Sequence, residues 1–158
     1  MLKRYLPLIL LLSLVVSCSK DKLNTKPSLS FKSINGNEFF PGGKVNITLS
    51  YTDKEGDLSK GVLTYIRNRL NTRPITDPAS NKLIDTVNSQ LPEFPKSATG
   101  EMNVLISYNF LNEEPLPIND SANASRYNDT MVFKIFVKDV AGNVSDTVTT
   151  PQIVQRAF

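Results

Sequence analysis

Apolar and polar residues alternate with a period of two through most of the chain after its first 27 residues. The clearest run is 44–52, where polar side chains alternate with apolar ones. Such alternation is typical of an antiparallel strand with one buried and one solvated face. We therefore predict a strand here, with a buried face made of Val45, Ile47, Leu49 and Tyr51.

Shorter runs of the same kind predict further strands, and no segment after residue 18 shows a helical period. Proline and small polar residues between the runs predict turns and loops, the longest of them at 71–81 and 112–129. About seven short strands in one domain favour an all-β antiparallel sandwich. The remaining predicted strands lie at 28–32, 62–70, 83–87, 101–111, 131–138 and 144–149, with Pro151 ending or bending the last.

The first residues have a different pattern. Lys3 and Arg4 precede an apolar run at 5–16, and the single cysteine of the chain, Cys18, follows it closely. A basic start, an apolar middle and small residues before a cleavage point are the features of a secretory signal peptide. The run is too short to remain as a spanning helix, which needs about 20 apolar residues.

Val15-Val16-Ser17-Cys18 resembles the lipobox of bacterial lipoproteins, in which the cysteine is acylated and becomes the first mature residue. The resemblance implies a lipoprotein signal peptide at 1–17, a lipidated flexible tether at 18–27 and one domain at 28–156. Cys18 is then the lipidation site, and the lipid is the contact with the membrane. The alternative is an ordinary signal-peptidase site beside a chance cysteine.

The residues after Cys18 bear on location. Ser19, where aspartate would indicate the inner membrane, resembles the sorting signal of outer-membrane lipoproteins, and Ser19-Lys20-Asp21-Lys22 is similar to the surface-export signal of Bacteroidota-type lipoproteins. The export pattern prefers two or more acidic residues, and only one is present. The expected location is the outer membrane, with the periplasmic and surface faces both left open.

Two short motifs resemble bacterial immunoglobulin-like, PKD-like and cadherin-like domains. One runs from Phe40-Pro41-Gly42-Gly43 through the alternating strand to Asp53-Lys54-Glu55-Gly56-Asp57, and the other is Val137-Lys138-Asp139-Val140-Ala141-Gly142-Asn143. The resemblance implies a single immunoglobulin-like sandwich. Tryptophan and a second cysteine are absent, which departs from antibody-type domains.

Composition removes several kinds of chemistry. The chain has no histidine and one cysteine, which excludes Cys/His zinc sites and histidine-based acid–base catalysis. The formal charge of +3 includes two basic residues of the signal peptide, so the domain is nearly neutral and gives no electrostatic case for nucleic acid. We predict no enzymatic activity.

Oxygen-bearing side chains gather in two predicted turns, one after the strand at 44–52 and one after the strand at 131–138. A hard cation such as Ca²⁺ takes six to eight oxygen ligands, so the two turns are a candidate Ca²⁺ site at an end distal to, or between, neighbouring modules. No other cofactor is expected. The alternative is that these residues are turn formers that bond to their own backbone. The candidate ligands are Asp53, Glu55, Asp57, Asp139 and Asn143.

Two groups of residues are candidates for contact with carbohydrate, one as binding platforms and one as glycosylation acceptors. Phe39, Phe40, Tyr127 and Phe136 are candidate platforms for sugar rings, and packing against the core is the alternative for each. Asp-Ser/Thr-apolar triplets resemble the O-glycosylation pattern of exported Bacteroidota proteins. The candidate acceptors, expected at loops or strand edges, are Thr86, Ser121 and Thr130.

These patterns together predict a non-catalytic binding, adhesion or scaffolding module at the cell envelope, with an envelope protein or a glycan as its partner. The first alternative is a glycan-binding accessory lipoprotein of a nutrient-uptake system, which aligned exposed aromatic rings would favour. An apolar edge strand would instead favour protein partners through strand addition. A hydrolase is the third alternative and needs converging carboxylates in a deep pocket.

Overall fold

The computed structural model describes residues 26–70, 84–108 and 128–156, and the regular structure within these ranges is entirely β-strand. These ranges hold no helix long and apolar enough to cross a membrane. The strands are β1 (Ser28–Ile34), β2 (Glu38–Phe39), β3 (Lys44–Thr52), β4 (Val62–Arg69), β5 (Ile84–Gln90), β6 (Thr99–Ser107), β7 (Asp129–Lys138), β8 (Val148–Thr149) and β9 (Ile153–Gln155).

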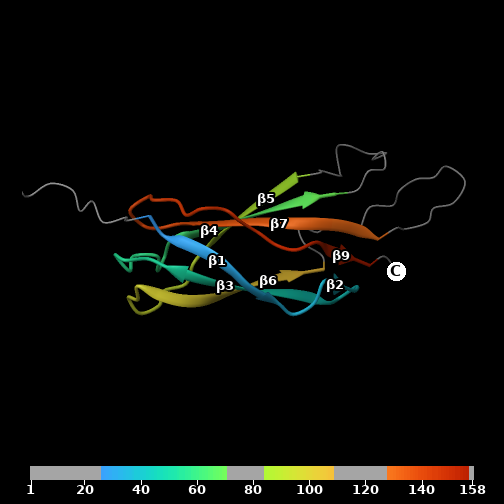
Figure 1. The fold of residues 1–158 in the computed structure, drawn as a ribbon, viewed down its shortest axis with the longest axis horizontal. Helices are drawn as coiled ribbons and strands as arrows, with labels where there is room; N and C mark the ends of the chain where they lie inside the picture. The colour runs from blue at the N-terminus through green and yellow to red at the C-terminus, as the bar shows by residue number, and fades with distance from the viewer. Residues whose placement is uncertain (1–25, 71–83, 109–127, 157–158) are drawn as a thin grey trace, which may run out of the picture.

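The strands form two sheets (Figure 1). The first has the order β1-β3-β6, and the second has the order β2-β9-β7-β4-β5, with β8 paired to β7. All pairings are antiparallel except that of β2 with β9. The all-β prediction is confirmed, and two facing sheets are consistent with a sandwich.

The core is one apolar layer shared by the two sheets. In β3 every second residue from Val45 to Tyr51 is buried, as the alternation predicts. From the other sheet, Phe133, Ile135 and Val137 of β7 are completely buried and belong to the same cluster. Removing these side chains from water contributes about 1.5–3 kcal/mol for each fully buried residue, and this term holds the sheets together.

Several strand boundaries differ from those expected. β6 starts two residues earlier than predicted, β5 continues to Gln90, and the two-residue β2 was not predicted. The ladder of β6 runs in register along the whole of β3, from Lys44 opposite Ser107 to Thr52 opposite Thr99. The length of a strand therefore follows its partner, even where its own alternation fades.

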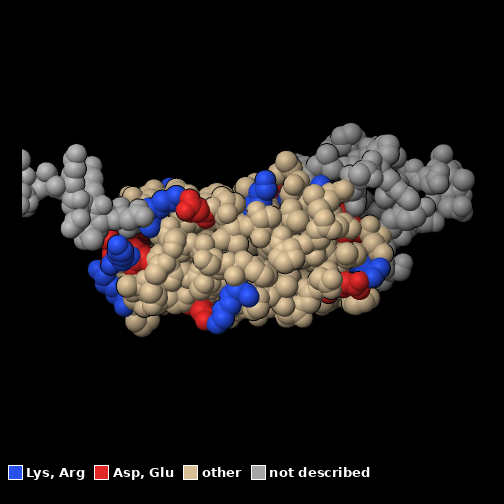
Figure 2. Space-filling view, viewed as in Figure 1, with Lys and Arg blue, Asp and Glu red and all other residues tan. Residues whose placement is uncertain are grey.

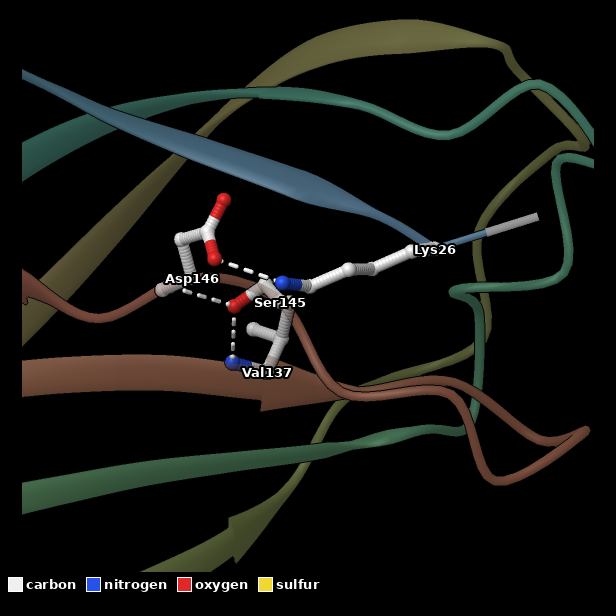
Figure 3. Close-up of polar contacts among 4 residues, drawn as sticks. All are labelled: Lys26, Val137, Ser145 and Asp146. Carbon is white, nitrogen blue, oxygen red and sulfur yellow. Dashed lines mark hydrogen bonds and ion pairs between the residues drawn. The ribbon is translucent and has the colours of Figure 1, made fainter. Parts of the chain in front are cut away.

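The predicted strand at 144–149 is wrong in its continuity. Val144 makes only an isolated bridge to Lys138, and pairing to β7 resumes in β8 and again in β9. At the two interruptions a hydroxyl replaces a backbone carbonyl as the acceptor. Ser145 Oγ accepts from Val137 N (3.0 Å; Figure 3), and Thr150 Oγ1 accepts from Phe133 N (3.0 Å). These side chains keep β7 satisfied where the edge departs from it.

Two buried ion pairs join β4 to its neighbours β5 and β7. Arg67 bonds to Asp85 on the neighbouring β5, and Arg69 Nε lies 2.9 Å from Asp129 Oδ2. The side chains of all four residues are almost completely buried. The period of two places both arginines on the inward face after Leu63 and Tyr65, and a buried charge requires a partner.

We predict that Asp85→Ala lowers the free energy of unfolding by about 3 kcal/mol or more, because it leaves the buried Arg67 guanidinium without this carboxylate. Denaturant unfolding measures the change. Asp146→Ala removes the exposed pair with Lys26 and serves as the control, with little expected change. Equal effects of the two substitutions would contradict the buried role of Asp85.

Candidate functional site

The two acidic turns lie together at one end of the sandwich. Residues 53–58 follow β3 and residues 139–143 follow β7, and Val140 N donates to Asp57 O at 3.4 Å. The carboxylate of Asp57 lies within the electrostatic influence of both Asp53 and Asp139. The fold therefore brings together acidic residues that are more than 80 positions apart in the sequence.

Asp53 organises the first turn. Its buried carboxylate accepts hydrogen bonds from Glu55 N (3.2 Å) through Oδ1 and from Leu58 N (2.9 Å) through Oδ2. Gly56 within the turn has a φ of 66°, which glycine adopts without steric cost, and donates to Asp53 O. Both carboxylate oxygens of Asp53 thus bond to the backbone of its own turn.

Asp139 has the same function in the second turn. Its Oδ1 accepts from Asn143 N (2.7 Å), and its Oδ2 accepts from Asn143 Nδ2 (2.9 Å). Gly142, between the two residues, has a φ of 95°. Asp139 and Asn143 therefore close the turn upon themselves, as aspartate and asparagine commonly do.

Asp57 differs from these two aspartates. Its Oδ1 is buried and has no hydrogen-bond partner among the described residues. Burial, followed by the negative charges of Asp139 and Asp53, raises the pKa of the Asp57 carboxyl, while the backbone N–H groups of Asp57 and Ala141 act in the opposite direction. Ionisation of the Asp57 carboxyl therefore destabilises the folded state.

The arrangement favours turn formation over Ca²⁺ coordination. Within the described ranges, no three acidic, histidine or cysteine side chains are grouped in a way that could hold a metal ion. The oxygens of Asp53 and Asp139 are occupied by protein donors, and Glu55 is exposed. Ca²⁺ would have to displace several of these bonds to obtain its six to eight ligands.

The acidic turns lie where the chain enters the domain, and we call this the tether end. Ser28 pairs with Thr52, immediately before the first turn, and Lys26 Nζ lies 2.5 Å from Asp146 Oδ1 (Figure 3). The opposite end, which we call the far end, holds Tyr108 and Gln155, joined by a bond from Gln155 Nε2 to Tyr108 O. Any ligand of the acidic turns would therefore bind next to residue 26.

The candidate glycosylation sites lie in different environments. Thr86 is exposed on the edge strand β5. Thr130 is the second residue of β7, is half-buried and pairs with Val154 of β9. Ser121 and the lipidation candidate Cys18 lie outside the described residues.

Two of the Asp-Thr-apolar triplets have a structural explanation. Asp85 and Asp129, the first residues of two of them, are the buried partners of Arg67 and Arg69. In a strand of period two, an inward aspartate is followed by an outward threonine and an inward apolar residue. The order of residues in these two triplets therefore follows the alternation of a strand that carries one buried carboxylate.

The candidate aromatic platforms do not form a common surface in the described part of the chain. Phe39 is buried and packs edge to face against Tyr108, with the ring centroids 5.7 Å apart. Phe136 is half-buried in β7, and Phe40 is 59% exposed. Tyr127 lies outside the described residues.

The sequence analysis missed an apolar pocket of about 500 Å³. It lies between the end of β3, the first half of β6 and the segment 91–97 that connects the two sheets. This segment, with Pro92, Phe94 and Pro95, lies between the predicted strands at 83–87 and 101–111. The two prolines on either side of the aromatic residue were the available signal. Proline restricts the backbone, so it limits the positions that the ring of Phe94 can take. The principal apolar lining residues are Tyr51, Leu91, Pro92, Phe94, Pro95 and Met102.

Comparison with known proteins assigns no family. No protein-family model matches the chain, and no curated protein matches it. Solved structures give distant likenesses that each cover 84% of the chain: the DNA glycosylase AlkC of Pseudomonas fluorescens (10% identity, TM-score 0.46), the sporulation control protein Spo0M of Bacillus subtilis (9%, 0.40) and a variant of the SrpA adhesin of Streptococcus sanguinis (19%, 0.35).

The chain spans less than two thirds of each of these structures, with 31% of AlkC, 50% of Spo0M and 58% of SrpA covered. At these identities and TM-scores the likenesses support no argument about fold family or activity.

We predict that Asp57→Asn raises the melting temperature at neutral pH by about 1–3 °C, because it removes a partly buried charge that faces two like charges. A raised carboxyl pKa in the folded state destabilises the fold above that pKa, and protonation on acidification removes the penalty. The gain should therefore disappear at acid pH. Glu55→Gln, on an exposed side chain of the same turn, is the control, and a loss of stability at neutral pH in Asp57→Asn would contradict the assignment.

We predict that Ca²⁺ at about 5 mM shifts the melting temperature by less than about 1 °C, because the Asp53 and Asp139 carboxylates already bond to protein donors. Thermal unfolding with Ca²⁺, with Mg²⁺ as the control, measures the shift. A rise of several degrees that saturates with Ca²⁺ alone would restore the two turns as a Ca²⁺ site.

Proposed function

We propose that this chain is a lipid-anchored protein of the bacterial outer membrane, whose single immunoglobulin-like domain serves as a non-catalytic binding or scaffolding module. The proposal rests on one observation: the described chain enters the domain at one end, and the strand ends that bound its two long connections lie at the other end. Residue 26 lies at the tether end, whereas the strand ends that bound the segments 71–83 and 109–127 lie at the far end.

The placement follows from the strand register. Ser28 pairs with Thr52 at the tether end, where Val62 pairs with Lys138. At the far end, Asn68 pairs with Ile84, and Leu70 N donates to Thr130 O. A chain held at Cys18 would therefore hold these far-end strand ends away from the membrane, where partners approach, and binding functions concentrate on the connections between strands.

The strand order supports the immunoglobulin-like part of the proposal. In that fold, strands A, B and E share one sheet, and strands C, F and G share the other. Here β1, β3 and β6 occupy the A, B and E positions, and β4, β7 and β8/β9 occupy the C, F and G positions. β5 extends the second sheet at its edge, as strand C′ does in variable-type domains.

The surface supports a protein partner. On the side shown in Figure 2, charged side chains lie mainly around the margin and leave a broad uncharged middle. Interfaces between proteins are depleted of charge at their centre, whereas a nucleic-acid interface needs a basic stripe. The aromatic rings of the described residues do not form a platform for sugars, so the glycan alternative has no comparable support.

We predict that Cys18→Ser abolishes incorporation of an alkyne-labelled fatty acid and moves the protein out of the detergent-extracted membrane fraction, because no thiol remains to be acylated. Labelling in cells followed by fractionation measures both effects. Thr25→Ala, in the same predicted tether, is the matched control and should behave like the unchanged chain. Retention of label and membrane association by Cys18→Ser would overturn the proposal.

A further inference from the structure

β6 is an open edge of the first sheet. Its only neighbour in the sheet is β3, and residues 100–107 make no other backbone hydrogen bond within the described part of the chain. Every second backbone N–H and C=O group of this segment therefore faces outward and can pair with another extended chain. Leu105, in the second half of the strand, is 63% exposed.

The other edge of this sheet is protected, and β6 is not. β1 carries a register shift between Phe31 and Ser33, with Lys32 between them, and bulges and lysines are the usual means of preventing unwanted strand pairing. β6 keeps an uninterrupted register over its full length and contains no proline or lysine. Its one charged residue, Glu101, already pairs with Lys32.

The apolar pocket lies beside the first half of the same strand, and its outer wall is held firmly. Leu91 N donates to Gly61 O (2.8 Å), and Phe94 N donates to Ser59 Oγ (3.0 Å). Asp53 N donates to Ala98 O (2.7 Å) at the other end of the wall. The connection 91–98 is thus fixed to the turn at 53–61, and the pocket does not depend on a ligand to form.

The floor of the pocket is aromatic. The Tyr51 ring lies directly over Gly100, its cross-strand partner, where a Cβ would come within 2.6 Å of Tyr51 Oη. The Phe94 ring lies 6.2 Å from that of Tyr51, at an angle of 49°. Met102, one inward position further along β6, is only half-buried. Apolar surface of Tyr51, Phe94 and Met102 therefore faces the open pocket, where a bound side chain could cover it.

We propose that the β6 edge and this pocket together bind an extended segment of a partner protein. The segment pairs with residues 100–107 as a fourth strand of the first sheet and inserts an apolar side chain between Tyr51 and Phe94. The inference deepens the proposed binding function and rests on it only in that the domain acts as a binding module.

The two halves of the site select this occupant. An unpaired strand edge is complementary to an extended backbone, and main-chain pairing supplies affinity while side-chain pockets supply specificity. Side chains of an added strand alternate between faces, so one residue would reach the pocket beside Met102 and a residue three positions away would cover Leu105 on the outer face. A rigid small molecule would occupy the pocket and leave the edge unpaired.

The test is selection and titration of peptides on the purified full chain in detergent. A phage-displayed library of random peptides of about twelve residues is panned against the chain, and the strongest peptide is labelled and titrated by fluorescence anisotropy. We expect a peptide in which apolar and polar residues alternate. Leu105→Lys and Phe94→Ala should each weaken its binding about ten-fold or more.

Two matched variants separate the site from general effects. Ile84→Lys changes an equally exposed apolar residue on the edge strand β5, and Phe136→Ala removes a half-buried ring from the other sheet. Both should leave the affinity within about two-fold. Thermal unfolding of all four variants shows whether each one folds. If Phe94→Ala does not fold, the result for Leu105→Lys decides the test.

Three results would overturn the inference. They are the selection of no peptide, binding that Leu105→Lys leaves unchanged, and sedimentation showing a dimer of the chain that Leu105→Lys abolishes. The last would assign the edge to a second copy. None depends on Cys18, so loss of peptide binding with intact fatty-acid labelling would reject this site and leave the membrane-anchored module in place.

Discussion

The apolar layer between the two sheets is the interaction on which the rest of the domain depends. It covers only the facing sides of the sheets, so polar backbone groups at their edges and ends need other partners. Val45, Ile47 and Leu49 from β3 meet Phe133 and Ile135 from β7, and almost no water reaches them. At the margins of this layer the backbone loses its ladder partners, and each margin needs a separate means of satisfying its polar groups.

Polar side chains provide most of these means. Asp53 and Asp139 bond to the backbone of the turns that they begin, and Ser145 and Thr150 accept hydrogen bonds from β7 where its neighbour departs. The cluster of acidic residues at the tether end is therefore explained by chain reversal at two adjacent strand ends. Asp57 is the exception, since burial and its neighbours' charges raise the pKa of its carboxyl.

The edge strands of the first sheet differ in how well they are protected against pairing with another chain, and this difference bears on function. In the first sheet, β1 is interrupted by a bulge at Lys32, whereas β6 remains regular and open. The edge strand β5 of the second sheet is also regular, but the apolar pocket lies beside β6. The combination of an open edge and an adjacent pocket is the basis of the proposal that β6 pairs with an extended partner segment. The described chain enters at one end of the sandwich, where Ser28 pairs with Thr52, and not along this edge.

The sequence by itself determined the all-β class, most strands and the inward faces of β3 and β7, because side-chain direction in a strand depends only on the period of two. It also supplied the basis for the anchoring proposal at Cys18, which is a local motif. Tertiary structure decided the strand lengths, the division of the last edge at Ser145, and the burial of Arg67 with Asp85. It also decided that Phe94 forms a pocket with Tyr51. Each of these depends on which segments become neighbours, and a period along one strand does not encode that.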